Sequence, residues 1–178
     1  MADTLAPADL VAAARVAEAG LRPVTGRDWS ARAGPLDWSV EQTITHMIAA
    51  TAKYTVYLAS RCEHFIALSI TRWPDATNEE IVDSIVPVAT ALANVAAVSP
   101  PGATGFHDGG PSSAADYLGR ACVELLVHTD DALAGLGAGF APPAELCLRV
   151  LAQQFPVNAA ADDEPWRRLV TATGRSPR

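Results

Sequence analysis

Hydrophobic residues recur every three or four positions along much of this chain, which is the spacing of an amphipathic α-helix. The clearest example carries Val40, Ile44, Met47 and Leu58 on one stripe. No stretch alternates strictly between apolar and polar residues, as a half-buried strand would. The pattern therefore predicts a helical protein, with one long helix from about Val40 past Leu58.

Capping signals fix where several predicted helices begin. Ser39 followed by Gln42, and Thr77 followed by Glu80, fit capping boxes in which two side chains satisfy free backbone amides. Pro87 falls inside the third helix and predicts a kink or an early break there. A long turn-rich connection, 99–111, precedes Ser112 and Ser113, either of which can cap the fourth helix. The predicted helices are 9–19, 40–58, 77–97, 113–135, 143–154 and 165–173.

The composition agrees with packed helices. Hydrophobic residues make up 49% of the 178 positions and charged residues 19%, and alanine, the strongest helix former, is frequent. This length suits one domain with a substantial core. The sequence thus predicts an all-α protein, a single domain over residues 1–178, arranged as an up-and-down four-helix bundle with additional short C-terminal helices.

The net charge and the cysteine content exclude several classes of partner and covalent cross-link. The formal charge of -7 gives no basic stripe for a nucleic acid and does not suit an anionic membrane surface. No N-terminal targeting pattern and no apolar run of membrane-spanning length is found, so we expect a cytoplasmic protein without nucleic-acid or membrane partners. Cys62, Cys122 and Cys147 show no CxxC pairing, so we expect reduced, partly buried thiols rather than disulfides.

Three residues suggest a metal site. Glu124 and His128 stand four apart, so a carboxylate and an imidazole share one helix face. His46, in the second predicted helix, is the candidate third ligand. Three protein ligands with a free coordination position are typical of a catalytic zinc-type site. The alternative is that such a pair arises by chance, as it does in many helices.

Two motifs resemble the DinB-like superfamily, specifically the N-terminal domain of mycothiol-dependent maleylpyruvate isomerase. The first is Asp28-Trp29 followed by the segment from Gly34 through Trp38 to His46, and the second runs from Glu124 through His128 to Asp131. The resemblance spans roughly residues 21–136 and implies that His46, Glu124 and His128 are metal ligands. Many relatives have histidine where this chain has Glu124, which places the chain nearer the mycothiol-linked branch. The isomerase carries a further C-terminal domain that this chain has no room for, so maleylpyruvate isomerisation is not implied.

These ligands suit Zn²⁺, although Ni²⁺, Fe²⁺ and Mn²⁺ accept the same set. A bound ion would lower the pKa of water or a thiol. The resemblance implies mycothiol or a similar thiol as cosubstrate, and hence a thiol transferase, lyase or isomerase acting on a small electrophilic metabolite. Because bundles of this family often pair, the resemblance also allows a homodimer. The alternative is a non-catalytic protein that binds metal or a small molecule for sequestration or resistance.

Further residues have two interpretations each. His107 is either an acid or base at the mouth of a pocket or an exposed side chain. Tyr57, on the flank of the helix that carries His46, is a better pocket candidate than Tyr54, but both also suit core packing. Asp131 either orients a ligand imidazole or is solvated near the helix end. His64 is expected on the surface, too far along the chain to share the ion.

Two tryptophans and three arginines also have a structural interpretation. Trp29 and Trp38 are expected to pack their loop onto the helices rather than to contact substrate. Arg149, Arg167 and Arg168 are candidates for binding an anionic substrate, with solvation at the surface as the alternative.

Overall fold

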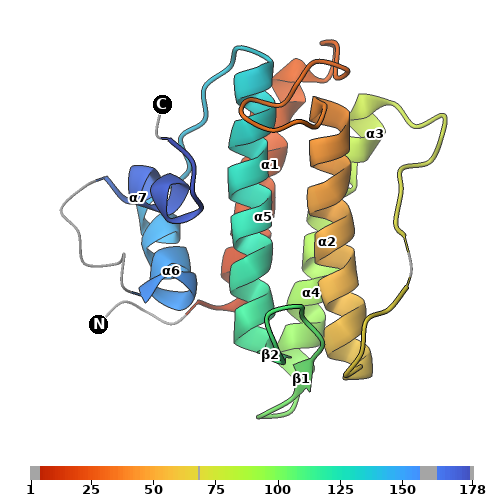
Figure 1. Cartoon of the computed structure of the whole chain (residues 1–178), viewed down its shortest axis with the longest axis vertical. Helices are drawn as coiled ribbons and strands as arrows, with labels where there is room; N and C mark the ends of the chain where they lie inside the picture. The colour runs from red at the N-terminus through yellow and green to blue at the C-terminus, as the bar shows by residue number, and fades with distance from the viewer. Residues whose placement is uncertain (1–4, 68, 157–163, 177–178) are drawn as a thin grey trace.

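The structure is a computed structural model that describes residues 5–67, 69–156 and 164–176. It is mostly helical, with 62% helix and 4% strand, which confirms the all-α class. Four long helices lie side by side in Figure 1. They are α1 (Pro7–Leu21), α2 (Val40–Ser60), α4 (Ile85–Val98) and α5 (Ala114–Gly135). The shorter elements are η1 (Arg22–Val24), α3 (Asn78–Asp83), β1 (Thr104–Gly105), β2 (Ser112–Ser113), α6 (Ala144–Gln154) and α7 (Pro165–Ala172).

The predicted capping boxes are present at the helix starts. At α2, Ser39 Oγ accepts from the Gln42 amide at 3.1 Å, and Gln42 Oε1 accepts from the Ser39 amide at 2.9 Å. At α5 the cap is Ser113, whose hydroxyl accepts from the Asp116 amide at 3.2 Å. These caps satisfy backbone donors that a helix leaves free. They fix the starts of the two helices that carry the candidate ligands.

The third predicted helix is divided in two, but not at the proline. The break lies at Ser84, between α3 and α4, and Pro87 occupies the first turn of α4. A proline inside a helix lacks an amide and clashes with the carbonyl four residues earlier, whereas the first turn requires neither interaction. The chain therefore breaks before the proline.

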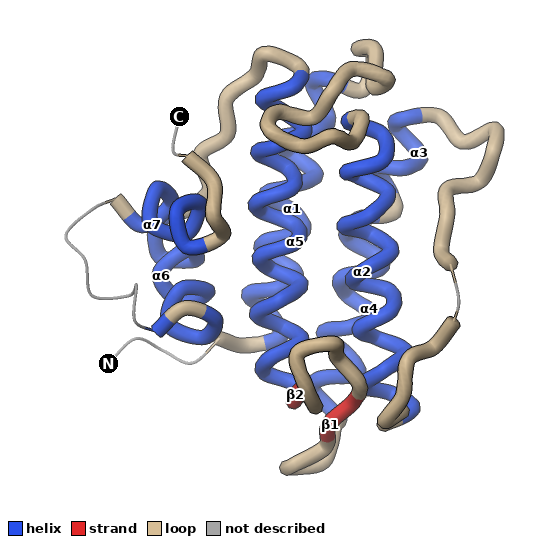
Figure 2. The backbone as a smooth tube through the Cα atoms, viewed as in Figure 1, coloured by secondary structure: helices blue, strands red, loops and turns tan. Residues whose placement is uncertain are grey.

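The order of helix directions differs from the predicted up-and-down alternation. Asn78 donates to the Thr25 carbonyl at 2.9 Å, and Arg27 donates to the Leu136 carbonyl, so α1 and α5 end where α3 begins. Figure 1 shows that α2 also begins at this end. Hence α2 and α4 run parallel, as Figure 1 shows. The connection 61–77, of which residue 68 is not described, returns the chain along the helices (Figure 2). A crossover of this length is what parallel neighbours require, and the sequence analysis did not assign it that role.

Small and aliphatic side chains let the helices approach closely. Helices α1 and α2 each pack against both α4 and α5, and α4 also contacts α5. Helices α6 and α7 pack on each other, with α6 against the outside of α5. Ala13, Ala14 and Ala17 of α1 are fully buried, as are Leu125 and Leu126 of α5 to within 1%. Continuous burial on α5 explains why it is the central helix: it contacts α1, α2, α4 and α6.

One apolar stretch needs a correction. Asn78–Val98 is long and apolar enough to cross a membrane by length and composition, although the sequence analysis found no such run. From Ile81 onward it carries a single charged residue, Asp83. In the structure this stretch forms α3 and α4, and its inner residues Ile85 and Leu92 are buried against neighbouring helices. A core helix meets the same composition requirement, so the stretch is weak evidence for a membrane span.

The turn-rich connection before α5 contains two very short strands that the sequence analysis did not predict. Thr104 pairs with Ser113 and Gly105 with Ser112 in antiparallel register. Gly105 lies so close to α2 that a Cβ atom there would stand 2.6 Å from the Tyr57 carbonyl oxygen. The pairing holds the loop 106–111 against the end of α2, where it helps to form a cavity described below.

Gly135 at the end of α5 should not tolerate a side chain. A Cβ atom there would lie 2.1 Å from the Arg32 carbonyl oxygen, which belongs to backbone that cannot move freely. We expect Gly135→Ala to lower the free energy of unfolding by about 2 kcal/mol, as overpacking does. Gly139→Ala is the control, because a Cβ atom there would have no heavy atom within 4 Å. Chemical denaturation of both variants tests this, and equal stabilities would contradict it.

Candidate metal centre

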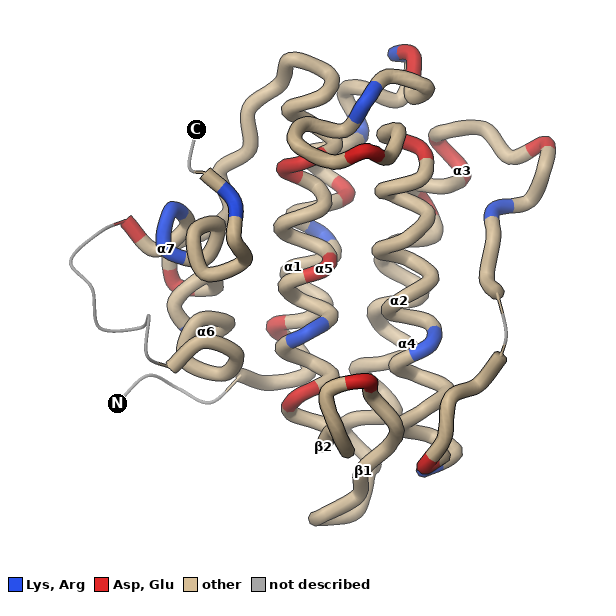
Figure 3. Tube along the Cα trace, in the orientation of Figure 1, with Lys and Arg blue, Asp and Glu red and all other residues tan. Residues whose placement is uncertain are grey.

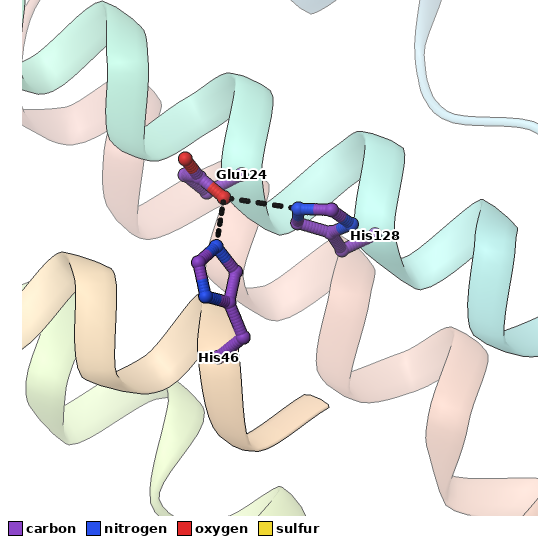
Figure 4. A group of neighbouring side chains, drawn as sticks. All are labelled: His46, Glu124 and His128. Carbon is purple, nitrogen blue, oxygen red and sulfur yellow. Dashed lines mark ion pairs between the residues drawn. The ribbon is translucent and has the colours of Figure 1, made fainter. Parts of the chain in front are cut away.

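His46, Glu124 and His128 converge between α2 and α5, as Figure 4 shows. One ligand atom from each lies within 4.8 Å of the others. Glu124 Oε2 stands 3.1 Å from His128 Nε2 and 3.4 Å from His46 Nε2. His46 comes from the second turn of α2, and the other two come from α5, its antiparallel neighbour. The structure thus brings together the three residues that the sequence analysis selected, although His46 and Glu124 are 78 positions apart in the sequence.

The spacing fits a tetrahedral ion. Bonds of about 2.1 Å at tetrahedral angles separate neighbouring ligand atoms by about 3.4 Å. The two separations from Glu124 Oε2, 3.1 and 3.4 Å, agree with this value, and the two imidazole ligand atoms lie within 4.8 Å of each other. Glu124 Oε2 is also buried and has no hydrogen-bond donor aligned to it among the described residues. A buried carboxylate oxygen without such a donor is costly unless a cation satisfies it. The cluster can therefore hold a metal ion.

The protonation states of the cluster reflect its crowding. Burial acts most strongly on Glu124 and raises its pKa, but the adjacent His128 and His46 imidazoles outweigh that effect and lower the pKa to about 2. For His128, burial lowers the pKa, while Asp131 and Glu124 together raise it above the ordinary value. Glu124 is therefore an ionised carboxylate at neutral pH, which is the form that binds a metal.

Asp131 orients the His128 ring. Its Oδ2 lies 3.1 Å from His128 Nδ1, and its side chain is completely buried. Arg175, which follows α7, donates to both carboxylate oxygens, with Nη2 2.8 Å from Oδ2. The interpretation of Asp131 as a solvated residue is therefore wrong. An imidazole whose Nδ1 donates to a carboxylate presents the Nε2 lone pair outward, and this is how proteins orient histidine ligands.

Tyr54, rather than Tyr57, contacts the cluster. The Tyr54 hydroxyl donates to Glu124 Oε1 at 3.3 Å, and burial and the Glu124 charge raise the pKa of the phenol, so it stays protonated. Tyr57 is buried, and its hydroxyl accepts from the Ile66 amide at 3.2 Å. Tyr57 lines the same cavity. Ideal helical spacing placed Tyr57 on the same flank of α2 as His46, and this favoured Tyr57. In the structure, Tyr54 is the tyrosine that faces Glu124 on α5.

Trp38 is a site residue that the sequence analysis assigned to loop packing. Its ring centroid lies 4.8 Å from that of His46 and 6.3 Å from that of His128, and the residue is 42% exposed. It covers the two imidazoles on their solvent side. Trp29, by contrast, is buried as expected and donates from Nε1 to the Val24 carbonyl at 3.1 Å. The one sequence feature that could have indicated this role is the position of Trp38 directly before Ser39, the cap of the helix that carries His46.

A cavity of about 940 Å³ opens beside the cluster. Its lining includes Trp38, His46 and Glu124 at one end and His107 on the loop before α5. Burial lowers the pKa of His107, and the Arg120 charge lowers it further, so the imidazole is neutral at neutral pH. The structure thus places His107 at the pocket, which was one of its two interpretations. A ligand position facing a cavity of this size is accessible to a small molecule.

The other sequence candidates lie elsewhere. His64 is exposed, beyond the end of α2, and its Nδ1 is 3.5 Å from Cys62 Sγ. Cys122 and Cys147 are buried free thiols, as expected. Arg149 pairs with Asp9 of α1, with its Nη2 2.9 Å from Oδ1, and neither lies among the cavity residues. These residues do not contribute to the cluster.

Comparisons of the chain with models of protein families, with curated proteins and with solved structures gave no match.

Proposed function

We propose that this protein is a metal-dependent enzyme with a DinB-like bundle, in which His46, Glu124 and His128 hold one divalent cation, preferably Zn²⁺. The observation that carries the proposal is the convergence of these three side chains at the edge of a large open cavity. Catalytic zinc sites use three protein ligands and leave a position for water or substrate, whereas structural sites are closed by four. No fourth protein ligand joins the cluster among the described residues.

The reaction we propose is transfer of a low-molecular-weight thiol, such as mycothiol, to a small electrophilic metabolite. A bound divalent cation supplies Lewis acidity that lowers the pKa of a thiol toward neutrality. The thiol loses its proton, its sulfur electron pair forms a bond to the electrophilic carbon, and the displaced pair leaves with the departing group. Lyase and isomerase reactions use the same thiol addition and its reversal.

The residues around the cluster have distinct tasks in this proposal. Asp131 holds His128 with Nε2 facing the ion, and Tyr54 fixes Glu124 by donating to its second oxygen. Trp38 limits the access of water from the solvent side. His107, neutral and lining the cavity, is the candidate acceptor for the thiol proton.

A small molecule suits the site better than a nucleic acid. The chain carries 20 acidic against 13 basic residues, and basic positions are interspersed with acidic ones in Figure 3. A nucleic-acid surface draws its affinity from clustered positive charge. The proposed partner is therefore a metabolite that enters the cavity.

Removal and replacement of the metal test the proposal. Protein stripped with a chelator should lose at least about tenfold in thiol transfer to a chloronitrobenzene acceptor and recover it with Zn²⁺. Protein loaded with Co²⁺ should develop a thiolate-to-metal absorption band when mycothiol or a simple thiol is added. Unchanged turnover in the stripped protein would overturn the role of the metal. Absence of the band would overturn thiol binding and favour a protein that only binds metal.

A further inference from the structure

The cavity beside the metal centre has two chemically different ends. His46, Ala50 and Lys53 follow one another at spacings of four and three residues, so they share one face of α2. All three line the cavity. The middle of this face carries only small apolar side chains, Ala49 and Ala50, which leave the floor open. The cavity therefore runs from the metal ligands to an ammonium group.

Lys53 is the only lysine in the chain. It is half-buried, its Nζ lies 4.7 Å from the centroid of the Phe65 ring, and no ion pair joins it to another described residue. In a chain with 20 acidic residues, a lysine inside a cavity would readily find a carboxylate if its role were only structural. Its ammonium is instead available to a ligand, against an aromatic wall formed by Phe65 and Phe106.

A second cation, on α5, adds to the positive potential near the cavity. Arg120, one turn before Glu124 on α5, has a buried Nε without a hydrogen-bond partner among the described residues. Its charge reaches Tyr54 and His107, both of which line the cavity. Arg120 itself does not line the cavity, so its charge adds positive potential from α5, whereas the Lys53 ammonium is the cation that a ligand can contact directly.

The acidic residues of the cavity do not cancel these charges. Glu41 Oε2 is paired with Arg72 Nη1 at 3.1 Å. Glu124 Oε2 lies 3.4 Å from His46 Nε2 and 3.1 Å from His128 Nε2 in the proposed metal centre, where a bound cation would neutralise its charge. Asp108 is exposed to solvent on its loop, where water screens its charge. A net positive end remains, facing a metal end across an apolar middle.

The distance between the ends sets the size of the ligand. Seven residues of helix separate the Cα atoms of His46 and Lys53 by about 10 Å. An aliphatic chain of about five methylene groups covers this distance once the metal bond and the hydrogen bond to the ammonium are added. We propose that the cavity binds an elongated organic anion, a carboxylate, with its anionic end on Lys53 and its opposite end at the metal centre. This inference rests on the proposed function for the metal end only.

Thiols with a terminal carboxylate test both ends separately. With Co²⁺-loaded protein, the thiolate absorption band measures binding of ω-mercaptohexanoate, of the uncharged ω-mercaptohexanol and of the shorter mercaptopropionate. We expect mercaptohexanoate to bind about tenfold more tightly than mercaptohexanol, because a charge-assisted hydrogen bond contributes about this factor. Mercaptopropionate, too short to reach Lys53, should show no such advantage.

Variants of Lys53 assign the effect. In Lys53→Met the advantage of mercaptohexanoate over mercaptohexanol should disappear, whereas Lys53→Arg, which keeps the charge, should retain most of it. An equal loss for both thiols in Lys53→Met would show that Lys53 only holds Phe65 in place and would overturn the proposal. Equal binding of both thiols to the original protein would also overturn it while leaving the proposed function intact. No thiolate band with any of the thiols would instead overturn the proposed function.

Discussion

Replacing either His46 or Glu124 by alanine is expected to abolish stoichiometric metal binding. The purified protein should carry about one divalent ion per chain, and each variant less than a tenth of that. Loss of a hydrogen bond that supports a ligand lowers metal affinity by up to roughly a hundredfold, and loss of one of the three ligands should lower it further. Elemental analysis of protein loaded with Zn²⁺ measures this directly. Thiol transfer should fall with the metal content.

Matched controls separate the cluster from general effects of the substitutions. His64→Ala removes an exposed imidazole beyond the end of α2, and Glu145→Ala removes an exposed carboxylate on α6. Both should keep the full metal content. Circular dichroism of all four variants checks that the helices remain. Retained metal in His46→Ala and in Glu124→Ala would contradict the assignment of the site.

Loss of Arg175 is expected to destabilise the protein and weaken the metal site together. Arg175→Met leaves the buried Asp131 carboxylate without its guanidinium, with only His128 as a charged partner. Breaking a buried ion pair by removing one partner costs about 3 kcal/mol or more. The metal affinity should fall about tenfold, since Asp131 orients the His128 ring. Urea denaturation and competition with a chromogenic chelator provide the two measurements.

Arg149→Met is the control for this variant. Arg149 also pairs with an aspartate, Asp9, but that pair is more exposed and lies away from the cluster. We expect a stability loss of about 1 kcal/mol or less and an unchanged metal affinity. Equal effects of the two substitutions on stability and metal affinity would show that the contact between Arg175 and Asp131 does not support the metal site.

The pH dependence of the Arg175 effect has a defined sign. Burial raises the pKa of Asp131, but His128 and Arg175 outweigh it and hold the pKa below its ordinary value. A carboxyl group with a lowered pKa in the folded state stabilises the protein above its unfolded pKa, and this contribution declines as the pH falls toward the folded pKa. The stability difference between the original protein and Arg175→Met should therefore be largest near neutral pH and shrink below about pH 4.

The helices and their caps were largely readable from local sequence. Ser39, with Gln42 three residues later, begins α2, and the boundary predictions for α5 and α6 differ from the structure by about a residue. Such signals are local, because a cap satisfies amides in its own first turn. The break lies at Ser84 and not at Pro87, where it was predicted. Proline is tolerated in the first turn of a helix, so its position alone does not show where the preceding helix ends.

The site was only partly readable. His46, Glu124 and His128 were named from spacing and motif, and the structure brings them together. For Asp131 the sequence left two interpretations open, and the roles of Tyr54 and Trp38 were not predicted, because their contacts with Glu124 and His128 join segments far apart in the chain. Arg175 reaches Asp131 from 44 residues away, and Tyr54 reaches Glu124 from 70. The spacing of hydrophobic residues along one helix does not show which other helix will pack against it.

The sequence by itself determined the helical class, most helix starts and the Glu124–His128 pair, because helix formation and i,i+4 spacing depend on residues within a few turns of one another. His46 was selected through the motif that contains it. The tertiary structure alone decided the parallel course of α2 and α4, the burial of Asp131 beneath Arg175, and the cavity that joins the metal centre to Lys53. These features arise from how separate helices pack. Packing depends on side chains from several segments at once, so it is fixed only when those segments come together.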